Sequence, residues 1–374
     1  MADNQRVVTP ARERDAFLDA LRGFALFGIL AVNLEAFADP FYSVARSGEP
    51  MADLGWAIIT FFFSGKFYTI FATLFGLGLA WQAARLRARG LDPQPVLRRR
   101  LWWLLGAGAV HGIFLFSGDI LGTYAVLGLF ALRYLERPHL LRTGLVYYAL
   151  GVALLAGLSF WFGPGGVSLD AAIYASGSFA EVTQVRLWDW LWNTGASIVL
   201  GFEILGLMLF GFYLFERWQG FSASTLRRGV LLGLLLGIPV NAYDVWAEPN
   251  YLEPLRGLGG LAFAVVYAAL IRLYWDRLSW LHPLQYAGRM PLTNYLLQSL
   301  VMSTVFYGYG LGLYGQVSPL LFPLIAVGFV ALQVLLSRWW LERLGQGPLE
   351  RLWRNYTYAG LKFKGQESSE SSDR

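Results

Sequence analysis

The chain has 374 residues, of which 56% are hydrophobic and only 15% charged, whereas soluble domains carry about 25% charged residues. Fifteen Trp, nineteen Tyr and twenty-seven Phe add to this apolar character, which excludes a water-soluble globular protein and favours a membrane protein. The net charge of +5 does not indicate nucleic-acid binding, because the arginines lie in short segments between apolar runs, and the lack of Cys excludes disulfides and thiolate metal sites.

Runs of about 18–20 apolar residues, the length that crosses a bilayer as a helix, recur along the chain. They predict an all-α fold, a polytopic transmembrane helix bundle of about ten spans over residues 17–345. Residues 1–16 are predicted to be a cytoplasmic segment without a signal peptide, and residues 346–374 a cytoplasmic tail whose last part is disordered. The predicted spans are 17–37, 55–82, 97–117, 119–136, 143–162, 190–215, 226–245, 255–275, 290–310 and 318–341.

The sequence also predicts a bend within one span and a short connection between two others. Span 55–82 is too long for one simple helix, and the sequence FFFSGKFYT within it predicts a bend near Ser64-Gly65. Spans 97–117 and 119–136 are joined only by SGD, which predicts a tight antiparallel hairpin.

The 30 Lys and Arg residues alternate in step with the predicted spans. On this layout 24 of them lie on one side of the membrane, whereas only Arg46, Arg186 and Arg256 lie on the other. The other three, Arg22, Lys66 and Arg289, lie within or at the ends of spans. Cytoplasmic loops are enriched in Lys and Arg, so the richer side is the cytoplasm. Both termini are therefore predicted to be cytoplasmic, and a missed or extra span would disrupt the alternation.

Ionisable residues inside apolar spans are costly, so those near the outer ends of the spans are candidate functional residues. His111 lies in the outer part of its span and Asp119 at the hairpin tip. A helical histidine near a carboxylate suits base chemistry near neutral pH, which makes them the candidate catalytic pair. The alternatives are a neutral His111 ring bonded to a neighbouring helix and an N-cap role for Asp119. The candidates for substrate binding on this side are Asn33, Glu35, Lys66, Glu203 and Asp244; for Glu35 and Asp244 the alternative is a solvated helix end.

A second group lies toward the predicted cytoplasmic side. Arg22 follows Asp19 by three residues, so the two share a helix face. Arg289 begins the ninth span, and an arginine at a helix N-terminus favours an anion such as phosphate. For both arginines the alternative is anchoring at the membrane surface. The polar candidates deeper in the ninth span are Asn294 and Gln298, four residues apart on one face.

Three stretches carry a family resemblance. LDALRGFALFGILAVNL (18–34), HGIFLFSGDILGTYAVLGL (111–129) and AGRMPLTNYLLQS (287–299) resemble the YeiB-like family of bacterial inner-membrane proteins, and GQGPLERLWRNYTYAG (345–360) is similar to its C-terminal signature. That family is similar to transmembrane acyltransferases such as heparan-alpha-glucosaminide N-acetyltransferase, which use cytoplasmic acetyl-CoA, an acceptor across the membrane and a catalytic His. The resemblance implies a multi-pass protein of the bacterial cytoplasmic membrane with an analogous role. Arg22 matches the shared LDxLRG pattern. The relatives' His, however, lies in the loop after the first span, and EAFADPFYSVARSGEPMADLG (35–55) contains none.

Taken with the two polar groups, the resemblance predicts transfer of an acyl group from cytoplasmic acyl-CoA, without a metal, to an extracytoplasmic hydroxyl or amine. Arg22 and Arg289 would hold the donor phosphates, and His111, oriented by Asp119, would act as the base. The alternative is a small-molecule transporter or exporter, because charges on two sides also suit alternating access. A non-catalytic scaffold would have no use for so many intramembrane polar residues. The expected partners are the lipid bilayer, a small-molecule or glycan acceptor and a second copy of the chain in a homodimer, with no nucleic acid.

Overall fold

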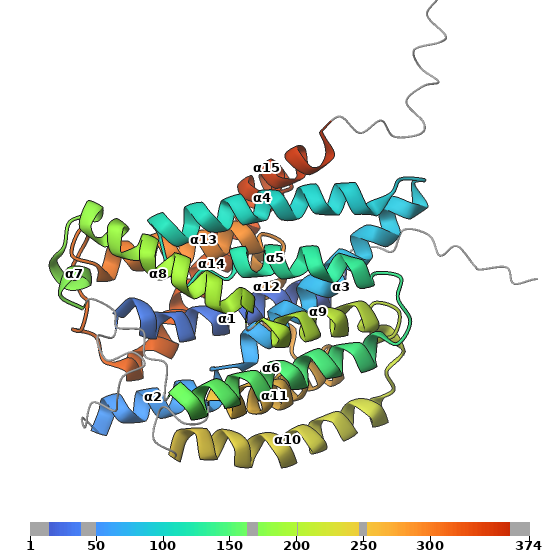
Figure 1. The fold of residues 1–374 in the computed structure, drawn as a ribbon, viewed down its shortest axis with the longest axis horizontal. Coiled ribbons are helices and arrows are strands. Elements are labelled where there is room, and N and C mark those ends of the chain that lie inside the picture. Colours follow the sequence, from blue (N-terminus) through green and yellow to red (C-terminus); the bar gives the residue numbers. More distant parts are fainter. Residues whose placement is uncertain (1–14, 39–49, 163–170, 200, 247–252, 360–374) are drawn as a thin grey trace, which may run out of the picture.

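The computed structural model describes residues 15–38, 50–162, 171–199, 201–246 and 253–359, and every regular element in them is a helix (Figure 1). The predicted all-α polytopic bundle is confirmed. Most of the predicted N-terminal segment and the polar end of the tail lie outside the described residues. The helices are α1 (Ala16–Ala38), α2 (Pro50–Phe62), α3 (Lys66–Ala88), α4 (Pro93–Phe114), α5 (Leu121–Ala131), α6 (Leu140–Phe162), α7 (Ala171–Ser176), α8 (Phe179–Val199), α9 (Phe202–Leu214), α10 (Ala223–Trp246), α11 (Glu253–Leu273), α12 (Leu284–Gly288), α13 (Pro291–Phe306), α14 (Phe322–Leu344) and α15 (Pro348–Tyr358).

Six helical segments of the described chain are long and apolar enough to cross a membrane, namely α1, the joined α2 and α3, α6, α10, α11 and α14. The bent pair of α8 and α9 makes a seventh if it forms one span. The other helices at predicted spans are shorter or charged: α5 is short, α13 has 16 residues, and α4 carries three consecutive arginines in its first half. The protein is thus a multi-pass membrane protein, and the ten-span layout stays a prediction.

The predicted bend and the predicted short connection are both present. The helix breaks between α2 and α3, where Gly65 has a φ of +85° that only glycine adopts without strain. The chain turns back between the end of α4 at Phe114 and the start of α5 at Leu121, and the two helices pack against each other (Figure 1).

One predicted span boundary is wrong. The span predicted over 190–215 is two helices, α8 and α9, bent by 62°. Helix α8 begins earlier than predicted, at Phe179. The hydropathy pattern missed its first turns because they contain polar residues such as the fully buried Arg186. The segment predicted as a tail from residue 346 starts with helix α15, which packs on α4.

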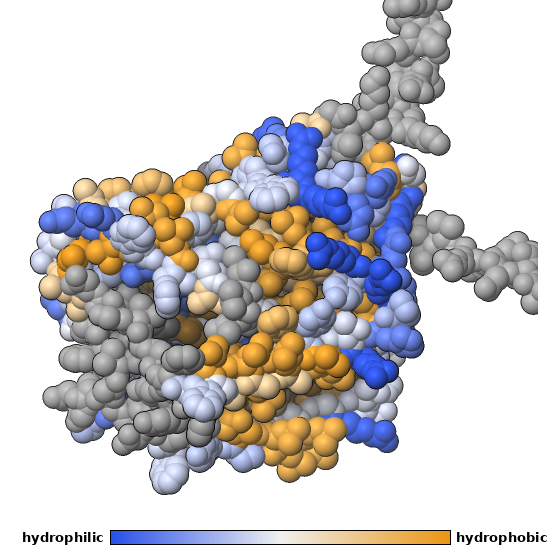
Figure 2. Space-filling model, in the orientation of Figure 1, coloured by the Kyte–Doolittle hydropathy of each residue, from blue (hydrophilic) through white to orange (hydrophobic). Residues whose placement is uncertain are grey.

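The helices differ in how much of their apolar surface is covered. In α1 72% of the apolar window is buried, but in α6 only 17% and in α10 only 22%, so α1 is central and the other two face lipid. Figure 2 shows an apolar band over this region and strongly hydrophilic residues along the edge where the helices of Figure 1 turn on the arginine-rich side. Two tryptophans at the opposite ends of helices, Trp161 of α6 and Trp246 of α10, are 80% and 79% exposed, as expected of an aromatic belt at a membrane surface.

Two glycines bring the motifs LDALRG and AGRMP together. The backbones of α1 and α12 approach so closely that a Cβ at Gly23 would overlap the carbonyl of Leu284, and one at Gly288 would overlap the carbonyl of Asp19. Small residues permit this kind of helix contact inside membranes. As a result Arg22 and Arg289, which are 267 positions apart in the chain, line the same pocket.

Candidate functional site

A row of three buried side chains joins the hairpin to α13. His111 Nδ1 lies 2.8 Å from Asp119 Oδ1, and His111 Nε2 lies 2.8 Å from the hydroxyl of Ser299. None of the three is more than 6% exposed. The hairpin brings the first two residues together because α4 and α5 meet at Gly108, where a Cβ would crowd the Asp119 carboxylate.

One neutral tautomer of His111 satisfies both contacts. In that tautomer Nδ1 carries the hydrogen and donates it to Asp119 Oδ1. The lone pair of Nε2 is then left to accept from the Ser299 hydroxyl, the arrangement in which a histidine withdraws a proton from a nucleophile. Asp119 Oδ2 also accepts from the backbone N–H of Gly122 at 2.8 Å, so this carboxylate orients the ring and caps the start of α5 at once.

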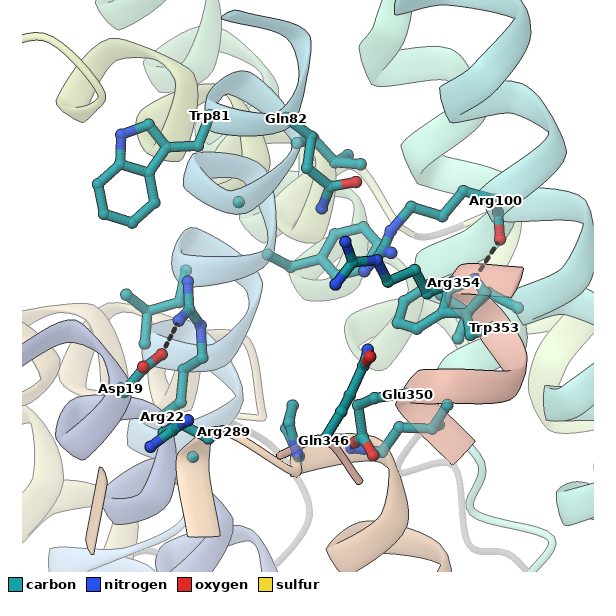
Figure 3. A pocket seen from close by; sticks show the side chains of 18 of the residues that line it. Asp19, Arg22, Trp81, Gln82, Arg100, Arg289, Gln346, Glu350, Trp353 and Arg354 are labelled. Carbon is teal, nitrogen blue, oxygen red and sulfur yellow. Dashed lines mark hydrogen bonds and ion pairs between the residues drawn. The ribbon is translucent and has the colours of Figure 1, made fainter. Parts of the chain in front are cut away.

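A pocket of about 750 Å³ opens at the arginine-rich end of the bundle between α1, α3, α4, α13 and α15. Six arginines and only two carboxylates line it, so its net charge is strongly positive. Figure 3 shows Arg22 and Arg289 on one side and Arg100 and Arg354 on the other. Arg22 is bonded to Asp19 at 2.6 Å, which confirms that they share a helix face.

Two of these arginines hold unused hydrogen-bond donors inside the pocket wall. Within the described residues, the buried Nε atoms of Arg100 and Arg289 have no hydrogen-bond partner. The Arg100 guanidinium lies 3.4 Å from the centre of the Trp353 ring, whose N–H donates to the Arg100 carbonyl at 2.9 Å. A guanidinium group that has unpartnered N–H donors and is held in place by stacking on an aromatic ring is well suited to bind phosphate.

The inner end of the pocket is apolar and ends beside the buried row. Its lining there includes Ile29, Tyr124 and Ile120, the residue next to Asp119. Tyr295 also lines it, and its ring centre lies 4.8 Å from that of His111. The pocket therefore runs from a basic mouth to an apolar end whose wall includes Tyr295, the ring that packs against His111.

The start of α13 is organised differently from the sequence-based expectation. Arg289 follows α12, and the first free N–H groups of α13 are occupied by Glu350 of α15. Glu350 accepts from the backbone of Leu292 at 2.8 Å and of Thr293 at 3.0 Å, and from the Thr293 hydroxyl at 2.6 Å. The helix N-terminus is thus capped by a carboxylate of the protein, and not by the phosphate that the sequence led us to expect there.

Asn294 and Gln298 lie outside the pocket, between α13 and α14. Asn294 Nδ2 donates to the hydroxyl of Ser337 at 2.9 Å, and Gln298 Nε2 donates to Gln333 Oε1 at the same distance. Gln333 in turn donates to the Asn294 carbonyl at 2.9 Å. These bonds join two helices, and the predicted binding role of the pair stays a prediction.

Three of the remaining outer candidates, Lys66, Glu203 and Asp244, belong to a second group of polar residues on α3, α9, α10 and α11. Fully buried Lys66 donates to the Thr60 carbonyl at 2.7 Å and to Asn241 Oδ1 at 2.5 Å. Asp244 pairs with Arg256 at 3.1 Å. Glu203 accepts from Tyr68 at 3.3 Å through one oxygen, while its other buried oxygen has no partner in the described chain.

Neither this cluster nor the end of α1 adjoins the pocket. Glu35 and Asp244 are 7% and 5% exposed, so the alternative of a solvated helix end is wrong for both. Asn33 is half-buried on the last turns of α1, next to the apolar core where Phe37 stacks on Phe116. The candidates on the predicted outer side thus divide among three regions, and of these candidates only His111 and Asp119 lie next to the pocket.

Sequence reasoning did not find Ser299, Arg100 or Trp353. Ser299 is one of many serines in apolar segments, and only its distance to His111 distinguishes it. Arg100 is the last of three consecutive arginines near the start of the predicted span 97–117, and the helical period turns it inward, toward the pocket, while Arg98 is exposed. Glu350 and Trp353 had a visible signal in the amphipathic stretch PLERLWRNYTY, which forms α15.

Comparison with known proteins gives a consistent result. Residues 213–360 match the family described as "Protein of unknown function (DUF418)". The uncharacterised protein YxaH of Bacillus subtilis (strain 168) is 31% identical over 94% of this chain and 96% of its own length. The uncharacterised protein YeiB of Escherichia coli (strain K12) is 32% identical over 92% of this chain and 96% of its own length.

Proposed function

The chain belongs to the YeiB-like family of multi-pass membrane proteins, and we propose that it is a transmembrane acyltransferase that moves an acyl group from cytoplasmic acyl-CoA to an extracytoplasmic hydroxyl or amine. The observation that carries this proposal is one pocket with an arginine-rich mouth and an apolar inner end beside a hydrogen-bonded Asp119–His111–Ser299 row. Phosphates would bind at the mouth, and the thioester would lie at the inner end.

The dimensions of the pocket support a donor of this kind. A volume of about 750 Å³ lies within the range of small-molecule and cofactor sites. Arg100 and His111 lie on the same helix, eleven positions apart, which corresponds to roughly 16 Å along its axis. The pantetheine arm of coenzyme A is comparable to four or five extended residues, which span about 14–18 Å. Phosphates bound at Arg100 would therefore leave the thioester close to His111.

The chemistry of the row supports group transfer. His111 Nε2 would accept a proton from a hydroxyl, and Asp119 would hold the ring in the required tautomer. The surroundings are closed to bulk water, since both side chains are at most 6% exposed. Exclusion of water favours transfer to an acceptor over hydrolysis of the thioester.

The acceptor side follows from the predicted topology. Asp119 lies at the hairpin tip on the predicted extracytoplasmic side, so the acceptor would be a small molecule or glycan that arrives from there. The bacterial cytoplasmic membrane is the proposed location, because only there does acyl-CoA meet one face of the protein. A homodimer in this membrane stays a prediction.

The test is binding of radiolabelled acetyl-CoA to the purified protein in lipid nanodiscs. We expect saturable binding that unlabelled CoA displaces and that weakens as salt rises, because phosphate–arginine contacts are screened. Saturable uptake into proteoliposomes of a solute, without acetyl-CoA binding, would instead support the transporter. The observation that favours that alternative is the second polar cluster around Lys66, which the acyltransferase reaction does not use.

A further inference from the structure

In the His111 tautomer that carries its hydrogen on Nδ1, the hydroxyl of Ser299 donates a hydrogen bond to His111 Nε2, at 2.8 Å. An external acceptor cannot approach this nitrogen unless Ser299 moves away, because the other side of the ring is held by Asp119 at 2.8 Å and one face is covered by Tyr295. The group that His111 is placed to deprotonate is therefore part of the protein.

The position of Ser299 also connects it to the pocket. Leu292 and Tyr295 line the pocket, and Ser299 follows Tyr295 by four residues on the same face of α13, roughly 6 Å further along the helix. The wall that guides a ligand inward thus continues to the Ser299 hydroxyl.

We propose that Ser299 is a nucleophile that carries the acyl group as a covalent ester between the donor and the acceptor. This inference rests on the proposed acyl-CoA donor and adds a two-step course to it. No residue of the sequence-based candidate set has this role.

The first step forms the bond between Ser299 Oγ and the acyl carbon and breaks the carbon–sulfur bond of the thioester. The Ser299 proton passes to His111 Nε2 and then to the departing CoA thiolate, so free CoA is released. In the second step the acceptor hydroxyl or amine attacks the ester carbonyl and gives its proton to His111. That proton returns to Ser299 Oγ as the ester bond breaks. Asp119 is a positioning residue in both steps, because it acts only through the ring.

The experiment is isotope exchange, which needs no knowledge of the acceptor. Purified protein in nanodiscs is incubated with unlabelled acetyl-CoA and tritiated CoA, and formation of tritiated acetyl-CoA is measured. Exchange occurs only if the acyl group leaves CoA and returns from a covalent intermediate. The acetyl group is then located by mass spectrometry of the peptide that carries Ser299.

We expect exchange in the wild type, a loss of at least about 100-fold in His111→Gln, since a base contributes about 10²–10⁴-fold, and no exchange in Ser299→Ala. Ser299→Cys should still become acetylated, but as a thioester that neutral hydroxylamine cleaves, a result that a purely structural serine would not produce. Ser303→Ala is the matched control, because Ser303 lies one turn further along α13, is equally buried and bonds to the Leu300 carbonyl. It should exchange like the wild type.

Two results would overturn the inference. One is exchange that persists in a folded Ser299→Ala variant or an acetyl group on another residue. The other is a wild type that binds acetyl-CoA and acetylates an acceptor but shows no exchange, which indicates direct transfer and leaves the proposed function intact. A wild type that does not bind acetyl-CoA refutes the proposed function itself, and the two-step course with it.

Discussion

The unpartnered N–H groups of Arg100 and Arg289 lead to a prediction about the affinity of the protein for acetyl-CoA. Each guanidinium has a buried Nε without a partner in the described chain, so each is available for a charge-assisted bond to phosphate. A hydrogen bond to a charged group contributes about 1.5–3 kcal/mol. Because 1.4 kcal/mol corresponds to a factor of ten, Arg100→Ala or Arg289→Ala should weaken acetyl-CoA binding by about 10- to 150-fold.

The assay is equilibrium binding of radiolabelled acetyl-CoA to nanodisc-embedded protein, with Arg338→Ala as the matched control. Arg338 lies on α14 near the same end of the bundle, is exposed, pairs with Glu342 at 2.8 Å and does not line the pocket. The same variants are titrated with a donor that lacks the 3′-phosphate. A variant that has lost its contact to that phosphate should bind the two donors with equal affinity, which identifies which arginine holds it.

The reasoning fails if Arg100→Ala and Arg289→Ala bind acetyl-CoA as tightly as Arg338→Ala does while all three melt at similar temperatures. Arg→Lys variants separate the effect of the charge from that of the guanidinium geometry. Lysine keeps the charge but loses the planar fork and its stacking on Trp353, so Arg100→Lys should recover only part of the affinity.

Further predictions concern topology and the polar groups outside the reaction. Reporter fusions at residue 90 and at the C-terminus should read cytoplasmic and those at residues 48 and 175 extracytoplasmic; one swapped location would break the ten-span layout. Glu350→Ala should lower the free energy of unfolding by about 1–3 kcal/mol, because it leaves the start of α13 uncapped, whereas Glu342→Ala, which removes an exposed pair, should cost about 0–1 kcal/mol in the same thermal melts. Lys66→Met should lower the melting temperature and leave acetyl-CoA affinity within about twofold, since distant sites are nearly independent; a tenfold change would connect the second cluster to the pocket.

The sequence predicted the bundle well because hydropathy and charge act on whole segments. The bend at Gly65 and the hairpin before Asp119 followed from local composition, and the structure has both. Helix α8 was misjudged because its polar residues are buried against the bundle, where Arg186 donates to the Phe114 carbonyl at 2.7 Å, and a hydropathy average does not register a satisfied polar group.

The candidate site was predicted only in part, because burial of a polar residue does not say what it faces. Lys66 and His111 read alike in the sequence as costly groups near the outer ends of spans. In the structure Lys66 directs its bonds to Thr60 and Asn241 within its own cluster, while His111 lies against Tyr295 of the pocket wall. The side to which a helical residue turns depends on helix packing between distant segments, and no local pattern contains that information.

Two helices connect the mouth of the pocket to the buried row, and this has a consequence for the donor. Helix α4 carries Arg100 and His111, and α13 carries Leu292 at the pocket wall and Ser299 in the row. A continuous helix fixes the axial separation of its residues at 1.5 Å each, so the phosphate-binding end and the reacting end cannot be adjusted independently. Donor binding at the mouth would therefore set the depth of the thioester, and donors with a shortened pantetheine arm should bind through their phosphates yet fail to reach Ser299. Binding energy at the mouth would in this way be used to position the reacting carbonyl, which fits the placement of the arginines at the mouth and of the row beside the inner end of the pocket.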